Sequence, residues 1–222
     1  MVGMTVAQQG SAQTPIHFQE QKLEEHDDWW RIEVRYPQLE ANNGFNQAVH
    51  RSVTEQADKF KQQLELPRSN EDPDRFEGDG GMDGTYTAKA LSNGVISVLF
   101  YYGEYTPGAV HPWGVLASLN YDTRNERLLS LADLFRPHTN YVAQLSKLAI
   151  ASLRQREGAE EEAIERGASP VASNFSVFTL TETELLLHFQ QYQVAPGVVP
   201  SEEVAIPLST LAPVLRARYR VR

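Results

Sequence analysis

The chain has 222 residues, enough for one large domain or two small ones, and its hydrophobic share of 41% is ordinary for a globular protein. Acidic residues outnumber basic residues by 29 to 20, which gives a formal net charge of −9. This balance argues against nucleic acid or an anionic membrane as the main partner, and it permits a cationic partner. Cysteine is absent, so disulfides and thiolate sites are excluded, and no apolar run reaches membrane-spanning length.

The first 14 residues are small and polar, and they contain no apolar core of a signal peptide. We expect a disordered leader there, either the remnant of a removed export signal or a plain flexible terminus. Residues 15–23 predict a first strand. Apolar and charged residues then alternate through residues 29–36, which predicts a half-exposed antiparallel strand.

Apolar side chains recur at spacings of three and four between Phe45 and Leu64, which predicts an amphipathic helix that begins near Asn42 and stops before Pro67. Residues 67–84 are rich in proline, aspartate and glycine and predict a loop. Its acids have the composition of a calcium loop but lack the ordered ligand spacing of an EF-hand, so a solvated acidic loop is favoured over a calcium site. These acids are Asp72, Asp74, Glu77, Asp79 and Asp83.

Residues 95–102 are apolar on both alternating faces, which is typical of a strand at the centre of a sheet. Asn93 and Gly94 predict a hairpin turn from a strand at residues 85–91, and a further strand is expected from His111 onward. We expect Val98 and Phe100 to be fully buried. The second face of the central strand should be covered by another helix or by the curvature of the sheet.

After Pro137 a second helix is predicted at residues 141–153, followed by a charged, solvated extension at residues 154–167. A hairpin, a short strand and a short helix complete the chain. This order predicts an α+β fold, with a largely antiparallel sheet and two long helices packed on it. We expect a strand–helix subdomain at residues 15–84 and a second subdomain at residues 85–222, forming one compact unit.

A hydrolase site can be sketched from one histidine and its neighbouring acids: His111, Glu104, Asp122 and Asp133. However, Ser118 lies on the opposite strand face from His111, and no Gly-x-Ser-x-Gly sequence exists. A packed, hydrogen-bonded His111 is favoured, and Asp133 is favoured as a residue that hydrogen-bonds the backbone at a turn or helix start. No pair of histidines has metal-ligand spacing, so we expect neither a metal ion nor a cofactor.

Aromatic residues flank the predicted turn at residues 103–108, and exposed aromatic rings can stack on sugars or anchor a protein interface. For Tyr101 a place in the core is favoured. For Tyr102, Tyr105 and Trp113 both core and surface roles stay open.

Five short motifs occur in order along the second half of the chain. They are Gly-Ala-Val-His-Pro at residues 108–112, Asn-Tyr-Asp at 120–122, Leu-Ser-Leu-Ala-Asp-Leu-Phe at 129–135, Phe-Gln-Gln-Tyr-Gln-Val-Ala-Pro-Gly at 189–197, and Ile-Pro-Leu-Ser-Thr-Leu at 206–211. Together they resemble the RsiV-like family. Its members form the extracytoplasmic part of lysozyme-sensing anti-sigma factors and are also attached to PdaC-type peptidoglycan deacetylases.

The resemblance implies an exported α+β domain of the bacterial cell envelope, periplasmic or secreted. Its expected role is non-enzymatic binding of a cationic protein such as lysozyme, or of peptidoglycan. The alternative is a hydrolase or deacetylase of envelope glycans that uses His111 and the nearby carboxylates. The expected ligand-binding residues are Tyr102, Glu104, Tyr105, His111, Trp113 and Tyr192, the last of which is suggested by the resemblance alone.

Overall fold

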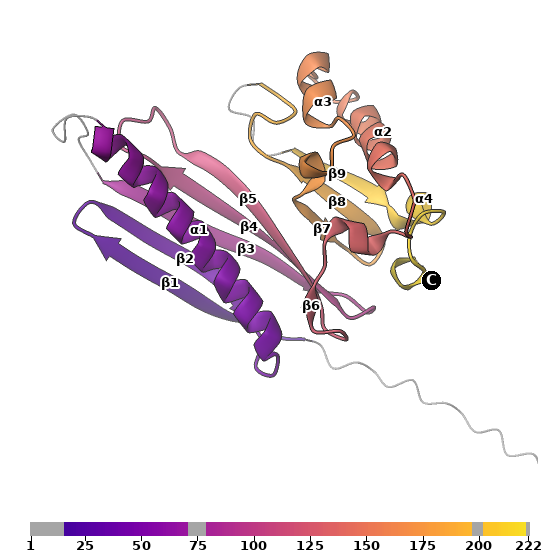
Figure 1. Cartoon of the computed structure of the whole chain (residues 1–222), viewed down its shortest axis with the longest axis horizontal. Helices are drawn as coiled ribbons and strands as arrows, with labels where there is room; N and C mark the ends of the chain where they lie inside the picture. Colours follow the sequence, from indigo (N-terminus) through magenta and orange to yellow (C-terminus); the bar gives the residue numbers. More distant parts are fainter. Residues whose placement is uncertain (1–15, 71–78, 197–201, 221–222) are drawn as a thin grey trace, which may run out of the picture.

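A computed structural model describes residues 16–70, 79–196 and 202–220, with side chains for all of these except 66–70 (Figure 1). The expected leader at residues 1–14 lies outside these ranges, as do Asp72, Asp74 and Glu77 of the expected acidic loop. None of the helices within these ranges is long and apolar enough to cross a membrane.

The N-terminal half of the chain forms a six-stranded sheet in the order β1-β2-β3-β4-β5-β6. The strands are β1 (Gln19–Asp27), β2 (Trp30–Gln38), β3 (Gly80–Ala90), β4 (Val95–Tyr105), β5 (Trp113–Asp122) and β6 (Arg127–Leu128). Strands β2 and β3 are parallel, and the other neighbouring pairs are antiparallel. A parallel pair needs a long crossover connection, which helix α1 (Asn43–Asn70) provides. The expected α+β fold with a largely antiparallel sheet fits this arrangement.

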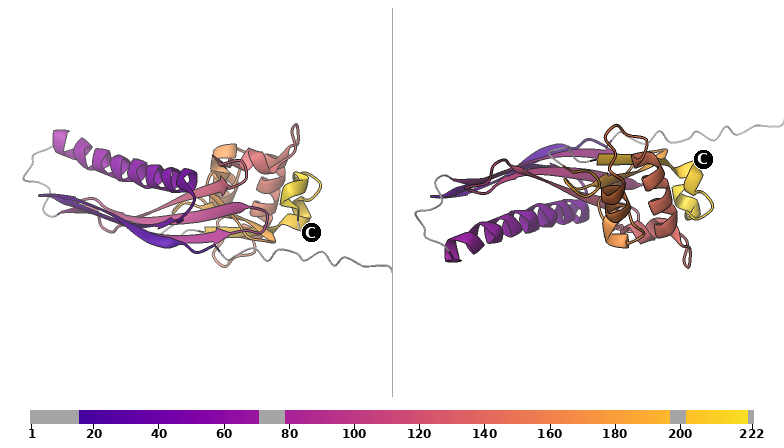
Figure 2. Two further views of the ribbon diagram at one scale, coloured as in Figure 1. Left: turned by 90° about the horizontal axis from the view of Figure 1, so that it is seen from below. Right: turned by 90° about the horizontal axis from the view of Figure 1, so that it is seen from above.

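Helix α1 lies along one face of this sheet (Figure 2). Its apolar stripe forms one core with alternate residues of the central strand, which are Ile96, Val98, Phe100 and Tyr102. Val98 and Phe100 are fully buried, as expected. The side chain of Asn42 accepts a hydrogen bond from the amide of Phe45 and so caps the helix. The expected stop before Pro67 is wrong: the helix continues to Asn70, and Pro67 costs it one backbone hydrogen bond because proline lacks an N–H.

The C-terminal half builds a second, three-stranded antiparallel sheet in the order β7-β8-β9. Its elements are a 3₁₀ turn (Leu131–Leu134), α2 (Tyr141–Leu153), α3 (Glu161–Gly167), a 3₁₀ turn (Ala172–Phe175), β7 (Phe178–Leu180), β8 (Glu184–Phe189), β9 (Glu202–Pro207), α4 (Leu208–Leu211) and a 3₁₀ turn (Ala217–Tyr219). Helix α2 packs on this small sheet through Leu145, Ala149 and Leu153.

Two expectations are corrected in this half. Helix α2 does not join α1 on the large sheet, because its apolar stripe is covered by the small sheet (Figure 1). The expected solvated extension at residues 154–167 contains α3, whose Ala163 and Ile164 are buried in the same core. The predicted division between residues 84 and 85 stays a prediction; strand β3 runs across that point.

Strand β7 covers part of the second face of the large sheet, the face turned away from α1. The Ser97 hydroxyl accepts a hydrogen bond from the Leu180 amide at 2.9 Å, and the Ser118 hydroxyl accepts one from the Phe178 amide at 3.0 Å. The Asn120 side-chain amide donates to the Phe178 carbonyl at 2.9 Å. We call Ser97, Ser118 and Asn120 the seam, because their side chains join the two sheets.

We expect Phe100→Ala to lower the free energy of unfolding by about 3–5 kcal/mol, because it leaves a cavity beneath α1. Denaturant titration monitored by circular dichroism measures this change. Leu128→Ala is the control, since Leu128 is 51% exposed and its loss should cost less than about 0.5 kcal/mol. Equal midpoints for the two variants would show that β4 is not central to the fold.

Candidate functional site

The four residues of the sketched hydrolase do not converge. Glu104 pairs with Trp113 at one end of β5, and Asp122 pairs with Val95 at the other end. A strand advances about 3.3 Å per residue, so these two acids are roughly 30 Å apart. They cannot act on one bond.

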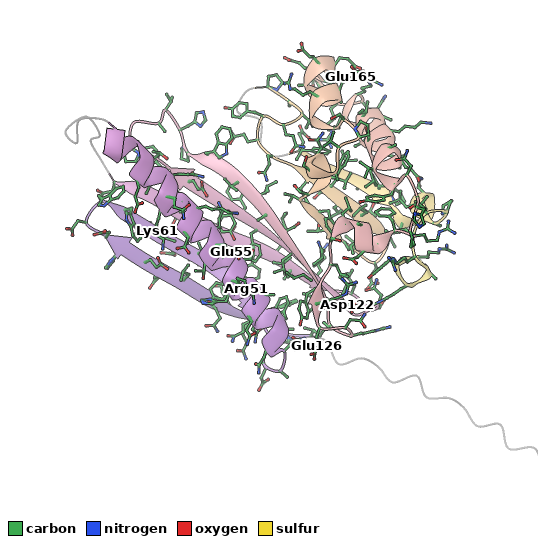
Figure 3. All side chains as sticks on the ribbon, viewed as in Figure 1. Arg51, Glu55, Lys61, Asp122, Glu126 and Glu165 are labelled. Atoms are coloured by element: carbon green, nitrogen blue, oxygen red, sulfur yellow. The ribbon has the colours of Figure 1, made fainter. Side chains whose placement is uncertain are left out.

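Asp122 forms a buried ion pair with the C-terminal segment; Figure 3 shows where it lies. Its side chain is 1% exposed. Both carboxylate oxygens accept from the Arg218 guanidinium, one of them at 2.7 Å, and Asn125 donates its side-chain amide as well. Burial alone would raise the pKa of Asp122, but the hydrogen bonds from Arg218, Asn125 and the backbone hold it well below its usual range. Asp122 therefore ties β5 to residues near the C-terminus.

Asp133 stabilises the start of the 3₁₀ turn at Leu131–Leu134. It accepts hydrogen bonds from the Ser130 amide at 2.8 Å and from the Ser130 hydroxyl at 2.7 Å. Its ion pair with Arg127, opposed by burial and assisted by Ser130, lowers the pKa of Asp133 to about 2. The interpretation of Asp133 as a residue that hydrogen-bonds the backbone at a helix start is confirmed.

Tyr102 and Glu104 lie beneath α1. Tyr102 is fully buried and its ring stacks on Phe100. Glu104 is 5% exposed and accepts a hydrogen bond from the Gln56 side chain at 2.7 Å, while burial raises the pKa of its carboxyl group. The helix therefore covers two of the six expected ligand-binding residues.

His111 and Tyr105 are half-buried at the same end of the sheet as Trp113. The expected strand does not include His111, because β5 begins at Trp113. The His111 ring nitrogen Nδ1 lies 3.0 Å from the carbonyl oxygen of Pro112. Within the described ranges, no group of three or more histidine and acidic side chains could hold a metal ion.

Trp113 and Tyr192 form an exposed aromatic pair where the two sheets meet. Their ring centroids are 5.2 Å apart, the rings are inclined by 26°, and the residues are 45% and 36% exposed. Tyr101 on β4 is 49% exposed but lies on the other face of the sheet, because it pairs with Leu116 whereas Trp113 pairs with Glu104 on the α1 face. We call Trp113 and Tyr192 the aromatic platform. The expectation that Tyr101 belongs to the core is wrong, because α1 covers the other face of β4 and the seam lies nearer the opposite end of the strand.

The absence of a side chain at Gly114 makes room for the ring of Tyr101. A Cβ atom there would lie 3.2 Å from two atoms of the tyrosine side chain, which is closer than an ordinary contact. The Gly114 amide donates to the Gln191 side chain at 3.0 Å. Gly114 therefore lies where β4, β5 and the segment after β8 come together.

Gln190, together with the Gln191 contact to Gly114, holds Tyr192 beside Trp113. The Gln190 side chain accepts from the Leu116 amide at 2.9 Å and donates to the Leu116 carbonyl at 2.7 Å. Tyr192 itself has φ of 63°, a left-handed conformation that is uncommon for a tyrosine. Only the motif at residues 189–197 pointed to this segment, and the position of its glutamines could not be predicted from spacing.

Two family models match successive parts of the chain. Residues 23–114 match the model described as deacetylase PdaC, and residues 132–209 match the model described as a protein of unknown function, DUF3298. The chain is also 26% identical over 188 residues to peptidoglycan-N-acetylmuramic acid deacetylase PdaC of Bacillus subtilis (strain 168). That alignment covers 84% of this chain and 39% of the relative, so the chain spans about two fifths of the relative's length.

Two solved structures share the fold over nearly their whole length. A DUF3298 family protein from Pseudomonas aeruginosa PAO1 aligns with a TM-score of 0.66 and 14% identity, covering 94% of this chain and 98% of that one. A member of the same family from Bacteroides fragilis NCTC 9343 aligns with a TM-score of 0.61 and 17% identity, covering 91% and 94%. The chain therefore has the fold of these DUF3298 proteins and also matches PdaC. The narrower RsiV-like assignment stays a prediction.

We expect Asp122→Ala to lower the free energy of unfolding by about 3–5 kcal/mol at pH 7, because it leaves Arg218 without its partner. The folded pKa of Asp122 lies below its unfolded value of about 3.9. The stabilisation is therefore full above about pH 4 and is lost as pH falls through the folded pKa. Chemical denaturation should show the gap between wild type and variant shrinking at pH 3.

Asp83→Ala is the matched control. Its side chain is 71% exposed and pairs only loosely with Arg31, so its removal should cost less than about 1 kcal/mol. The assigned role of Asp122 would be contradicted if Asp122→Ala lowered the free energy of unfolding no more than Asp83→Ala does, or by the same amount at pH 3 as at pH 7.

Proposed function

We propose that this chain is a domain of the bacterial cell envelope whose aromatic platform binds the glycan strands of peptidoglycan without modifying them. The exposed stack of Trp113 on Tyr192 carries this proposal. The faces of aromatic rings pack well against the apolar faces of sugar rings, and rigid aromatic side chains contribute much contact area at low entropic cost.

The relative from Bacillus subtilis supports the choice of ligand. Its name says that it acts on N-acetylmuramic acid in peptidoglycan, and the chain aligns with only 39% of its length. We therefore propose that the part shared with this chain contributes glycan recognition. Because peptidoglycan lies outside the cytoplasmic membrane, the same proposal implies an extracytoplasmic location.

A cationic protein such as lysozyme stays the second binding hypothesis. It rests on the net charge of −9 and on the resemblance to lysozyme-sensing proteins. The two partners differ in physical chemistry, because stacking on sugars depends weakly on salt while binding steered by opposite charges weakens steeply with it. The deacetylase alternative built on His111, Glu104, Asp122 and Asp133 gains no support from the positions of these residues.

We expect Trp113→Ala and Tyr192→Ala each to weaken binding of soluble peptidoglycan fragments at least tenfold, which corresponds to about 1.4 kcal/mol. Isothermal titration calorimetry with muropeptides measures this loss, and a pull-down on insoluble peptidoglycan provides a second readout. Trp113→Phe, which keeps an aromatic face, should retain most of the affinity. Leu128→Ala is the control, because it removes an equally exposed apolar side chain elsewhere on the sheet.

Salt separates the two hypotheses. Affinity for muropeptides should change less than about threefold between 50 and 300 mM sodium chloride. Muropeptide binding that is unaffected by Trp113→Ala and Tyr192→Ala, or no binding at all, would overturn the glycan proposal. Tight binding of lysozyme that collapses at 300 mM salt would then favour the cationic partner.

A further inference from the structure

A cleft of about 200 Å³ lies between the two sheets on the side away from α1, and Leu99, Leu180 and Leu186 contribute apolar surface to it. One wall is the outer face of the small sheet, and the other is the face of β3 and β4 opposite the helix. Its polar lining includes Thr87 and Lys89 from the large sheet and Thr179, Thr181, His188 and Glu203 from the small sheet. The cleft is large enough for a group of several non-hydrogen atoms, since a water molecule occupies about 30 Å³ in the liquid.

Three residues on neighbouring strands of the small sheet form a line along this cleft. The Thr179 hydroxyl oxygen lies 2.7 Å from Nε2 of His188, and Nδ1 of the same ring lies 3.4 Å from a carboxylate oxygen of Glu203. Strand register explains the alignment. His188 pairs directly with Glu203, and Thr179 pairs with Leu186 two residues before His188, so all three side chains are on one face.

Thr179, His188 and Glu203 follow one another in the order of nucleophile, base and carboxylate that a general-base system requires. A proton on Nδ1 directed at Glu203 leaves Nε2 free to accept the proton of the Thr179 hydroxyl. Burial lowers the pKa of His188 to about 4, so the ring is neutral at neutral pH and Nε2 has a lone pair free to accept the hydrogen bond of the Thr179 hydroxyl. The charged groups that line the cleft are Glu203 and Lys89, both largely exposed.

The opposite faces of the same strands already supply the core. Phe178, Leu187 and Val204 are buried against α2 and its neighbours. Thr179 and His188 are 8% and 5% exposed but turn toward the cleft instead. A buried hydroxyl and imidazole cost desolvation free energy that apolar side chains would not, which favours a role for the pair beyond packing.

We propose that this cleft is an acyl-transfer site for short-chain esters, with Thr179 as nucleophile, His188 as general base and acid, and Glu203 as the residue that orients His188. Thr179 Oγ1 attacks the ester carbonyl carbon while its proton moves to His188 Nε2. The bond from carbon to the alcohol oxygen then breaks, and the alcohol leaves with the proton from the imidazolium. Water, deprotonated by His188, next attacks the acyl-threonine; the short-chain acid is released and Thr179 regains its proton. The Lys89 ammonium at the rim supplies positive charge for the anionic intermediate.

The full chain should hydrolyse p-nitrophenyl acetate, and mass spectrometry of quenched reactions should find an acetyl group on the peptide that carries Thr179. Mapping the adduct separates this reaction from non-specific acetylation of lysines. Thr179→Ala should abolish that adduct, Thr179→Ser should retain it, and His188→Gln should slow hydrolysis at least about a hundredfold. Thr210→Ala is the control, because Thr210 is exposed on α4, is not among the residues that line the cleft, and should leave the rate within twofold.

If Thr179, His188 and Glu203 served only to stabilise the fold, a different result would be expected. Thr179→Val keeps the shape of the side chain and removes the hydroxyl, and its thermal unfolding is measured beside its hydrolysis. Loss of the adduct and of hydrolysis in a variant whose melting temperature is unchanged supports the acyl-transfer site. A wild-type chain without an adduct on Thr179, or hydrolysis that Thr179→Ala and His188→Gln leave intact, would overturn it.

Discussion

The seam between the two sheets is the constraint on which the other features depend. The Ser97 hydroxyl donates to the Asn120 side chain at 2.5 Å while accepting from the Leu180 amide, and it is 3% exposed. Backbone groups of β7 that a neighbouring strand would usually satisfy are satisfied here by side chains of the other sheet. This contact fixes the distance between the sheets. That distance in turn sets the width of the cleft and brings the segment after β8 to the end of β5.

Much of the fold could be predicted because its apolar residues repeat with the period of a helix, about 3.6 residues, or of a strand, two residues. The stripe from Phe45 to Leu64 and the uninterrupted strand around Phe100 leave few alternatives for α1 and β4. What an apolar stripe cannot specify is the surface that covers it, and so α2 was assigned to the wrong sheet. In the sequence, Ser97 only interrupts the apolar pattern of residues 95–102. Its role requires knowing that β7, far along the chain, lies opposite.

The candidate sites depend even more on long-range contacts. Trp113 could be singled out as an aromatic residue beside a turn, but its stacking on Tyr192 requires the hydrogen bonds that Gln190 makes to β5. If the strand register had been known, the alternation of side chains along a strand would have placed Thr179 and His188 together on the outer face of a hairpin. A polar residue in such a position is most often solvated, and only the second sheet makes it part of a cleft.

The side chain of Gln190 has a consequence for how the molecule avoids self-association. Strand β6 pairs with β5 only at Tyr121 and Asp122, which leaves the outer edge of β5 open around Leu116. An open edge is a template on which another chain can add a strand. Gln190 occupies both hydrogen-bonding groups of Leu116, just as a neighbouring peptide unit would. Gln190 thus satisfies this part of the edge as one residue of a neighbouring strand would, close to the exposed rings of Trp113 and Tyr192.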